Sequence, residues 1–202
     1  MKTLVAATSN EAKLAEIREI LADLALTVAS QADFGLEAID ETGATFAENA
    51  LIKARHAAAC AGLPAVADDS GLMVDALGGR PGVFSARYAG EAATDRENIE
   101  KLLGELHDVD EARRSASFRC TAAFVASADD PAPLIAEGEW WGRILARPRG
   151  SGGFGYDPVF YDPAHGRTAA EMTDAEKNGA SHRGQAFRRL AGLLRERGLV
   201  GK

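Results

Sequence analysis

The sequence predicts an α/β protein in which helices flank a mixed β-sheet. In the first third of the chain, short apolar runs alternate with segments of helical periodicity, which is typical of strand–helix–strand units. In the middle, two long strand-like runs are separated by a short polar connection, which favours an antiparallel pair. A sheet that contains both kinds of neighbour is mixed and not purely parallel.

The N-terminal third supplies the first strands and helices. Residues 4–7 form a short apolar run that predicts a buried strand, and the polar residues 8–10 provide a helix cap. Residues 11–23 have the periodicity of a helix, and residues 26–29 predict a second strand. A polar stretch over residues 33–43 then leads to the next helix.

The next helix is predicted over residues 46–61, because Thr45 and Glu48 have the spacing of a capping box at its start. Residues 65–67 predict a third short strand. We expect this strand to end in an acidic turn, Asp68-Asp69-Ser70-Gly71, because serine and glycine favour turns.

The remaining elements follow with less regular spacing. Residues 72–77 look extended, a Gly/Pro-rich loop covers 78–82, and Thr94 with Glu97 caps a helix that reaches about residue 106. Further along, the elements expected are strands 116–127 and 134–144, a glycine-rich loop 150–158, a strand 159–161 and a helix 184–197.

Composition and charge limit the classes of function. The 202 residues include 46% apolar and 26% charged side chains, which suits one globular domain. No apolar run reaches the roughly 20 residues of a membrane span, and no signal-peptide pattern is present, so we expect a cytoplasmic protein. A net charge of −7 disfavours broad binding to nucleic acid but not binding of a small anion.

The two cysteines give no sign of metal or redox chemistry. Cys60 and Cys120 belong to no CxxC pair, and neither has an adjacent histidine in the sequence. We expect both to be buried, reduced thiols.

A candidate phosphate-binding segment joins the first strand to the first helix. The free N–H groups and positive dipole end of a helix N-terminus attract anions, and Lys13 lies on its first turn. An ordinary capped helix has the same appearance, and the Walker A pattern is absent. The candidate residues are Thr8, Ser9, Asn10, Glu11, Ala12 and Lys13.

The acidic segment is a candidate metal site. Two adjacent carboxylates, Asp68 and Asp69, repel one another, and Mg²⁺ would resolve the repulsion because it prefers one or two carboxylates plus phosphate oxygens. Glu41 offers a second metal contact and Lys53 a phosphate partner. Taken alone, Asp68-Asp69-Ser70-Gly71 is slightly better explained as a polar turn, and the segment around Glu41 as a solvated loop.

Two later segments carry groups that could contact a ligand. The glycine-rich loop lets its backbone approach a ligand closely, and Phe154 would stack on a planar ring. Positive charge and hydrogen-bond donors are supplied shortly before the last helix by Lys177, His182 and Arg183. A flexible hairpin connection and a basic helix start are the plainer interpretations.

Taken together and in this order, the segments resemble the inosine/xanthosine triphosphate pyrophosphatase family. The resemblance extends from Leu4 to the final helix, with Ser9 where the family often has glycine. The matching segments are Thr8-Ser9-Asn10 with Lys13, Glu41-Thr42-Gly43, Phe46-Ala47-Glu48-Asn49-Ala50 with Lys53-Ala54, Ala67-Asp68-Asp69-Ser70-Gly71-Leu72, Pro81-Gly82-Val83-Phe84-Ser85-Ala86-Arg87-Tyr88, Gly152-Gly153-Phe154-Gly155-Tyr156-Asp157-Pro158, Lys177 and Ser181-His182-Arg183.

The resemblance implies a single nucleoside triphosphate pyrophosphatase domain over residues 1–202. Its sheet would be elongated, with two lobes and the nucleotide site between them. The resemblance also implies a homodimer and a requirement for Mg²⁺. The implied reaction hydrolyses deaminated purine nucleoside triphosphates (dITP, ITP and XTP) to the monophosphate and pyrophosphate, which removes them from the nucleotide pool.

The resemblance also implies roles for individual residues. Asp69 would be general base and metal ligand, Asp68 would support it, and Glu41 would be the second metal contact. The residues expected to bind substrate are Thr8, Ser9, Asn10, Glu11, Ala12, Lys13, Lys53, Ser70, Phe154, Gly155, Tyr156, Asp157, Lys177, His182 and Arg183.

Selectivity would follow from hydrogen-bond polarity at position 6 of the purine. Hypoxanthine and xanthine present an acceptor there, so donors such as Arg183 and the His182 backbone would be left unpaired against adenine. Guanine shares that oxygen, and its rejection needs an element that these donors do not supply.

Three other functions deserve comparison. A nucleotide-binding module without catalysis has little need of the paired aspartates. A phosphomonoesterase that forms an aspartyl-phosphate would release orthophosphate and not pyrophosphate. A structural protein with polar loops would need none of these segments in this order.

Overall fold

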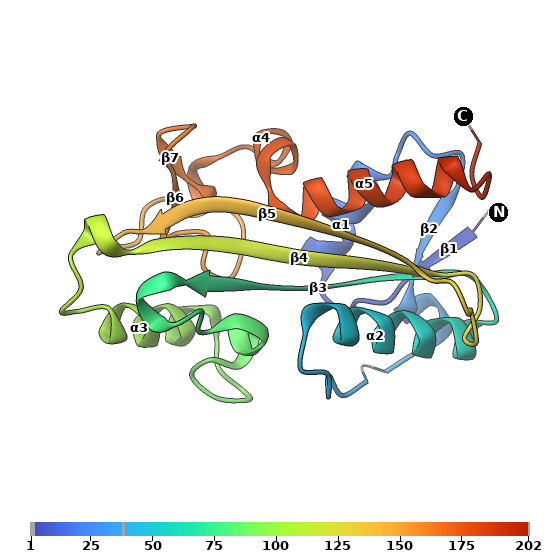
Figure 1. Ribbon diagram of the computed structural model, residues 1–202, viewed down its shortest axis with the longest axis horizontal. Helices are drawn as coiled ribbons and strands as arrows, with labels where there is room; N and C mark the ends of the chain where they lie inside the picture. Colours follow the sequence, from blue (N-terminus) through green and yellow to red (C-terminus); the bar gives the residue numbers. More distant parts are fainter. Residues whose placement is uncertain (1–2, 38, 202) are drawn as a thin grey trace. The chain divides into compact units, whose positions relative to one another are not determined.

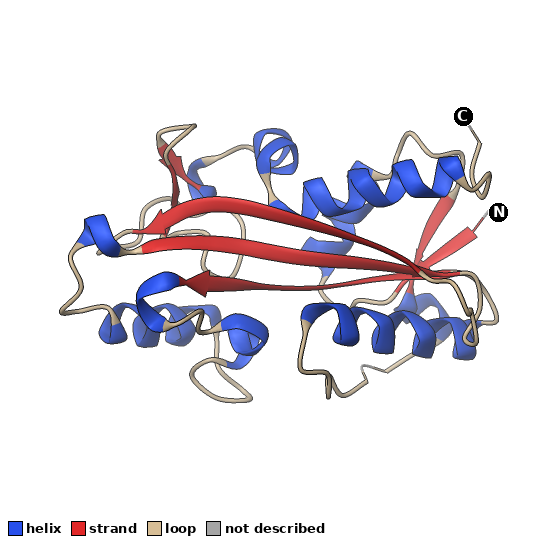
Figure 2. Cartoon of the chain, viewed as in Figure 1, coloured by secondary structure: helices blue, strands red, loops and turns tan. Residues whose placement is uncertain are grey.

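The computed structural model describes residues 3–37 and 39–201, and its central feature is a mixed seven-stranded sheet with the order β2-β1-β3-β4-β5-β6-β7 (Figures 1 and 2). β1 pairs in parallel with both β2 and β3, whereas β6 pairs antiparallel with β5 and β7. The mixed α/β class is therefore confirmed. The strands are β1 (Thr3–Ala6), β2 (Thr27–Ser30), β3 (Ala65–Val74), β4 (Ser115–Val125), β5 (Leu134–Ile144), β6 (Phe160–Asp162) and β7 (Arg167–Thr168).

Five α-helices and several short 3₁₀ segments complete the described chain. The α-helices are α1 (Glu11–Ile20), α2 (Phe46–Ala61), α3 (Asp95–Glu105), α4 (Asp174–Ala180) and α5 (His182–Glu196). The 3₁₀ segments are Gln31–Phe34, Asp75–Leu77, Gly82–Arg87, Glu111–Arg113 and Ala169–Glu171. No helix in the described ranges combines the length and apolar character that crossing a bilayer requires.

Helix starts follow the capping chemistry of the sequence. The Asn10 side chain accepts a hydrogen bond from the Lys13 backbone N–H at the start of α1. Both predicted capping boxes form, with Thr45 at α2 and Thr94 at α3. α2 ends at Gly62, whose φ of 64° is a left-handed conformation that glycine adopts at little cost.

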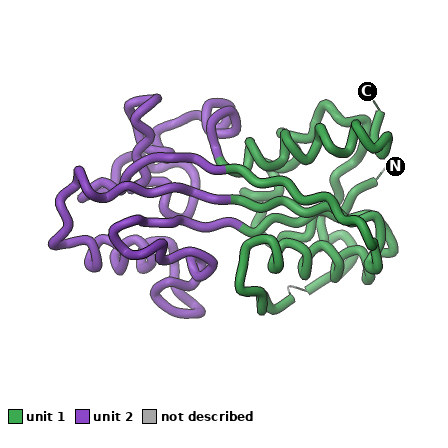
Figure 3. Tube along the Cα trace, in the orientation of Figure 1, with its two compact units in different colours: residues 1–69, 120–138, 182–202 green, residues 70–119, 139–181 purple. Residues whose placement is uncertain are grey.

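The chain divides into two compact units, coloured green and purple in Figure 3. Each unit is assembled from separate stretches, and β3, β4 and β5 contribute residues to both. Unit 1 comprises Met1–Asp69, Cys120–Gly138 and His182–Lys202, and unit 2 comprises Ser70–Arg119 and Glu139–Ser181.

Unit 1 buries apolar side chains on both faces of its strands. On one face, Leu4, Ala6 and Val66 pack in a cluster with buried residues of α1 and α5. On the other face, Val5 and Ala67 pack with the alanines of α2. Because alternate residues of a strand point to opposite faces, the strand positions of β3 are divided between the two helical layers.

Unit 2 has one cluster of buried side chains, centred on aromatic rings. Phe160 lies 4.5 Å from Phe118 and 5.0 Å from Trp140, measured between ring centroids. The Trp140 indole N–H donates to the Asp162 carboxylate over 2.9 Å, so the buried ring nitrogen is satisfied.

Several predicted boundaries are wrong, and the acidic turn is the most consequential. Residues 65–74 form one continuous strand, so Asp68-Asp69-Ser70-Gly71 is not a turn but lies in the middle of β3. The strand continues because the carboxylates have buried partners and because Gly71 faces close neighbours. A Cβ there would lie 2.3 Å from the Gly82 carbonyl oxygen.

Other boundaries differ more modestly. The first helix ends at Ile20 and not at residue 23, and the extended segment 72–77 is strand only as far as Val74. α4 and β7 were not predicted, and the last helix begins at His182, so His182 and Arg183 lie in its first turn and not before it. Strands β4 and β5 are neighbours that run in opposite directions, as predicted (Figure 1).

Candidate functional site

The side chains of the two aspartates in β3 point to opposite faces of the strand in unit 1. Val66 and Cys120 belong to the cluster with α1 and α5, and Asp68 contacts that side through the thiol of Cys120 at 3.8 Å. Ala67 belongs to the cluster with α2, and Asp69 accepts from the Asn49 side chain of α2 at 3.0 Å. The alternation of a strand therefore separates two carboxylates that are adjacent in sequence.

Asp68 is held in a dense arrangement of cations. Its Oδ2 accepts from the Arg183 Nε and Nη2 at 3.2 and 3.1 Å and lies 3.7 Å from the Lys13 Nζ. A third guanidinium nitrogen of Arg183 donates to the Glu16 Oε2 at 2.5 Å. Arg183 is 1% exposed and Asp68 is 2% exposed, so this is a buried ionic network.

This network fixes the charge of Asp68. Burial raises the pKa of the Asp68 carboxyl, but the opposing charges of Lys13, Arg183 and Lys53 outweigh burial and hold that pKa well below its usual range. Arg183 responds in the opposite direction, because the charges of Asp68 and Glu16 outweigh its burial and raise its pKa. Asp68 is thus a permanent anion at neutral pH.

Asp69 has a different electrostatic environment. Burial raises the pKa of its carboxyl, and the nearby Glu41 charge adds to the rise, while Lys53 and the hydrogen bond from Asn49 only partly oppose it. A carboxylate whose proton affinity is raised is better suited to accept a proton from water than one held as a fixed anion.

Lys53 lies between the two carboxylates that the sequence assigns to metal binding. Its Nζ is 2.6 Å from the Glu41 Oε1 and 3.6 Å from the Asp69 Oδ1. Burial lowers the pKa of Lys53, but the charges of Asp69, Asp68 and Glu41 outweigh it and raise that pKa. Two carboxylates that converge on one ammonium group are arranged around a single cation position.

The donor set fits Mg²⁺ chemistry. Mg²⁺ takes oxygen ligands and needs only one or two carboxylates when substrate phosphates and water complete the shell. Asp68 Oδ1 is buried and has no hydrogen-bond partner among the described residues, which leaves unused acceptor capacity on the face of β3 opposite to Asp69. Across residues 3–37 and 39–201, no three His, Cys, Asp or Glu side chains gather as an all-protein metal cage.

The segment before α1 presents an exposed helix N-terminus. The Asn10 N–H donates to the Thr8 hydroxyl at 3.1 Å, and the Lys13 N–H donates to the Asn10 side chain at 3.0 Å. Ser9 and the first helical residues, Glu11 and Ala12, are exposed to solvent. The predicted phosphate-binding segment therefore sits at the end of β1, with the Lys13 side chain directed to Asp68.

In unit 2, the glycine-rich loop is organised by Asp157. The Asp157 Oδ2 accepts from the Phe154 N–H at 3.0 Å and from the Lys177 Nζ at 2.7 Å. The Lys177 Nζ also lies 4.5 Å from the centre of the Phe154 ring, within cation–π range. Asp157 and Lys177 are 3% and 5% exposed, whereas Phe154 is half-buried.

Two other predicted residues of this loop have structural contacts. The Tyr156 hydroxyl donates to the Ser85 carbonyl oxygen at 2.9 Å, and its side chain is buried in the core of unit 2. The Gly155 N–H donates to the Asp95 carboxylate at 2.7 Å. Ser70 lies in β3 next to Asp69 and is half-buried.

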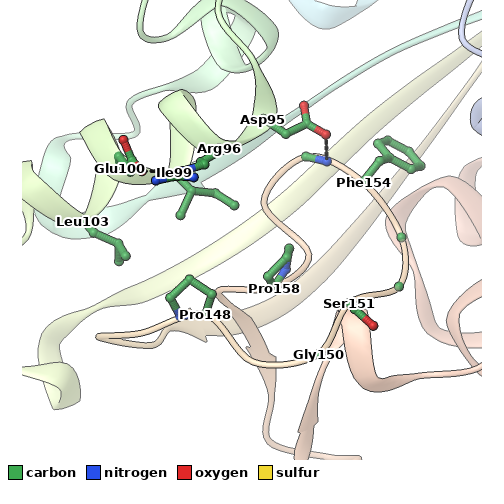
Figure 4. Close-up of a pocket in the computed structure, with 13 residues that line it drawn as sticks. Asp95, Arg96, Ile99, Glu100, Leu103, Pro148, Gly150, Ser151, Phe154 and Pro158 are labelled. Carbon is green, nitrogen blue, oxygen red and sulfur yellow. Dashed lines mark hydrogen bonds and ion pairs between the residues drawn. The ribbon is translucent and has the colours of Figure 1, made fainter.

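A cavity of about 560 Å³ lies between the glycine-rich loop and α3, within unit 2 (Figure 4). Its α3 wall includes Ile99 and Leu103, and Pro148 and Pro158 line it near the two ends of the loop. In Figure 4 the Phe154 ring points away from these apolar side chains, on the other side of the loop backbone. The loop, with Phe154 among its lining residues, is therefore one wall of the cavity.

His182 and Arg183 begin α5 and belong to unit 1. His182 is buried, and its carbonyl oxygen lies so close to β5 that a Cβ on Gly138 would come within 2.0 Å of it. Arg183 contacts Asp68 and Glu16, so its contact with a base edge remains a prediction.

Sequence reasoning missed several residues that complete these sites. Asn49 was visible in the motif that follows Thr45, but its link to Asp69 was not. Glu16 lies one helical turn after Lys13, on the same side of α1, and that spacing was the available signal. Cys120 is buried as predicted, whereas Cys60 is exposed and lies 3.9 Å from the His56 Nδ1.

The sequence also matches a known family of proteins. Residues 4–193 match the Ham1 family. The chain belongs to the Ham1 family.

Individual members of the Ham1 family are similar over nearly the whole chain. A Yersinia pseudotuberculosis protein named dITP/XTP pyrophosphatase is 54% identical over 97% of this chain and 100% of its own length. A Ham1 protein from Coxiella burnetii has a solved structure with a TM-score of 0.89 at 55% identity, covering 97% of this chain and 100% of that one. A Ham1 protein from Staphylococcus aureus gives a TM-score of 0.85 at 37% identity over 97% of this chain and 100% of that one.

Proposed function

We propose that this protein hydrolyses deaminated purine nucleoside triphosphates, namely dITP, ITP and XTP, to the nucleoside monophosphate and pyrophosphate. The names of its Ham1 relatives support this assignment. The observation that carries it is the division of the adjacent β3 carboxylates between two electrostatic environments, with Asp68 a fixed anion and Asp69 a carboxylate of raised pKa.

In this proposal the residues of unit 1 bind the triphosphate and orient the attacking water. Lys13, Lys53 and the exposed N-terminus of α1 offset the negative charge of the phosphates. Asp69 orients a water molecule for attack on the α-phosphorus and accepts its proton. Asp68 holds Lys13 and Arg183 in place around this centre.

We also propose that the reaction requires Mg²⁺, held by Glu41 and Asp69. When bound, the ion would polarise phosphoryl oxygens and lower the pKa of water in its shell. In the structure, Lys53 lies between these two carboxylates, so it would move toward the substrate phosphates when the metal binds.

The base is proposed to stack on Phe154 in unit 2. The Lys177 ammonium near the Phe154 ring withdraws electron density from the ring, which favours stacking of a purine on it. Gly155 and Tyr156 stabilise the conformation of the loop through their hydrogen bonds. Asp157 and Lys177 supply polar groups that hydrogen-bond to the edge of the base. Donors for the purine position-6 oxygen would include the backbone of His182.

Product analysis tests the reaction. The protein is incubated with Mg²⁺ and, separately, dITP, ITP, XTP, dGTP or dATP, and the phosphate species released is identified. We expect pyrophosphate from the first three substrates and much slower release from dATP. Orthophosphate as the first product, or equal rates on dATP and dITP, would contradict the proposal and favour an aspartyl-phosphate mechanism.

The role of Asp69 is tested by Asp69→Asn, with Asp75→Asn as a control because Asp75 is an exposed acid shortly after the same strand. Loss of a general base lowers rates by about 10²–10⁴-fold, so we expect kcat to fall by at least about a hundredfold while dITP still binds. The control should retain kcat. An Asp69→Asn variant that keeps more than about a tenth of the wild-type kcat would remove Asp69 from this role.

The metal requirement is tested with EDTA. Chelation should abolish turnover and leave the circular dichroism spectrum unchanged, because Lys53 already balances the acidic pair without a metal. Activity that persists in EDTA would contradict the requirement. The homodimer and the cytoplasmic location remain predictions from the resemblance and the sequence, and light scattering of the purified protein would test the former.

A further inference from the structure

The peptide groups on both sides of Phe154 are fixed by two different carboxylates. The Phe154 N–H donates to the buried Asp157 of the same loop at 3.0 Å. The next N–H, that of Gly155, donates to Asp95 at 2.7 Å, and Asp95 is the first residue of α3, sixty positions earlier in the chain. The first bond is local to the loop, whereas the second ties the loop to a separate helix.

Two fixed peptide planes determine the direction of the side chain between them. The plane before Phe154 sets its φ angle and the plane after it sets its ψ angle, so the Cα–Cβ bond of Phe154 has one direction when both bonds are made. The Phe154 carbonyl oxygen of that second plane also accepts from the Asp157 N–H at 3.2 Å, so loss of the Asp95 bond leaves ψ less restrained. The ring would then be held less firmly, although the bonds to Asp157 and the contact with Lys177 remain.

The surroundings of Gly155 give the loop freedom to move once that bond is lost. The cavity of about 560 Å³ lies directly behind the loop, and no heavy atom outside the immediate chain comes within 4 Å of the Cβ position of Gly155. Glycine at φ 59° resists displacement less than other residues because it has many accessible conformations. Figure 4 shows the Asp95 hydrogen bond at the upper end of this wall.

We propose that Asp95 is a positioning residue for base recognition, and that its hydrogen bond to Gly155 holds the Phe154 ring in the orientation needed to stack on the purine. This inference rests on the proposed function. Asp95 does not touch the substrate in this proposal and acts through the loop backbone, which distinguishes it from the residues that the sequence assigns to substrate binding.

The test compares three single variants. Asp95→Ala removes the acceptor, and Asp95→Asn keeps an uncharged acceptor. Glu97→Gln is the matched control, because it removes a negative charge from the same helical turn while a glutamine still completes the capping box with Thr94. We expect Asp95→Ala to raise the KM for dITP about tenfold with kcat within about threefold, Asp95→Asn to lie between, and Glu97→Gln to match wild type.

A double variant shows whether the effect passes through the ring. If Asp95 acts by orienting Phe154, then adding Asp95→Ala to Phe154→Ala should change KM by less than about twofold, because the ring to be oriented is already gone. Independent, multiplied effects of the two substitutions would overturn the proposal. An unchanged KM in Asp95→Ala would also overturn it.

Hydrogen exchange separates this proposal from the proposed function. Peptides that cover residues 150–158 should exchange at least about fivefold faster in Asp95→Ala than in wild type or Glu97→Gln, with or without substrate. Faster exchange in a protein that does not hydrolyse dITP would leave the loop contact standing and reject the substrate assignment. Unchanged exchange with a normal wild-type reaction would reject the role of Asp95 alone.

Discussion

Replacing Arg183 with methionine should destabilise unit 1 strongly, because Arg183 neutralises a carboxylate that cannot reach water. Methionine keeps most of the length of the side chain and removes the charge. The Asp68 carboxylate would remain buried, with the Lys13 Nζ still 3.7 Å away. Glu16 would lose its bond of 2.5 Å to the same guanidinium.

The size of the effect follows from the bonds removed. Three N–H groups of Arg183 donate to carboxylate oxygens, and each such bond contributes about 1.5–3 kcal/mol. Removing the guanidinium also removes the cost of burying it, so the net loss is smaller than the sum. Breaking a buried ion pair on one side costs about 3–5 kcal/mol, and we expect a loss in that range. For a chain of this size it lowers the Tm by about 6–20 °C.

The assay is a double-mutant cycle read by thermal unfolding. Arg183→Met, Asp68→Asn and the double variant are compared, with Arg119→Met as a surface control, because the Arg119–Glu139 pair is 48% and 34% exposed. The control should lose less than about 1 kcal/mol. We expect the buried pair to be coupled by at least about 2 kcal/mol, so that the double variant is more stable than additivity predicts. Additivity within about 0.5 kcal/mol would refute the reasoning.

Three further predictions concern other parts of the chain. Gly71→Ala should destabilise β3 by about 1–3 kcal/mol in urea unfolding, because the new Cβ would overlap the Gly82 carbonyl oxygen, which lies 2.3 Å from its position. Burial raises the pKa of the Asp162 carboxyl, but its hydrogen bonds outweigh burial and lower that pKa in the folded protein. The Asp162 carboxylate therefore stabilises the fold above its unfolded pKa of about 3.9, and this stabilisation is lost as the pH falls through the lower folded pKa. Asp162→Asn should therefore make stability less dependent on pH below about 4, and an unchanged acid profile would contradict this. Iodoacetamide should modify the exposed Cys60 in the folded protein and leave Cys120, whose pKa burial raises well above its usual value, until the chain unfolds; mass spectrometry counts the labels.

Much of the local structure could be predicted from the sequence, because it depends on hydrogen bonds between residues that are close in the chain. The capping boxes at Thr45 and Thr94 form as predicted, since donor and acceptor lie three residues apart. The same signal was available for α4, where Thr173 and Glu176 form a capping box, but this helix of 7 residues was not predicted.

The full length of β3 could not be predicted from the sequence, because the residues that stabilise it are distant in the chain. Asp68 and Asp69 look like turn residues when only their neighbours are considered. They are tolerated in a buried strand because Asn49 and Arg183, 20 and 115 positions distant, supply hydrogen bonds. The chemistry of the segment was predicted from residue type, whereas its conformation depended on partners that only the fold brings together.

The way the chain threads through unit 1 has a consequence for its synthesis. Unit 1 includes the stretch His182–Lys202, so the guanidinium partner of Asp68 leaves the ribosome 115 residues after Asp68 itself. Until then, the nascent chain carries a carboxylate destined for burial without one of the cations that neutralise its charge. A truncation before residue 182 therefore removes α5 and also the two hydrogen bonds that Arg183 donates to the buried Asp68.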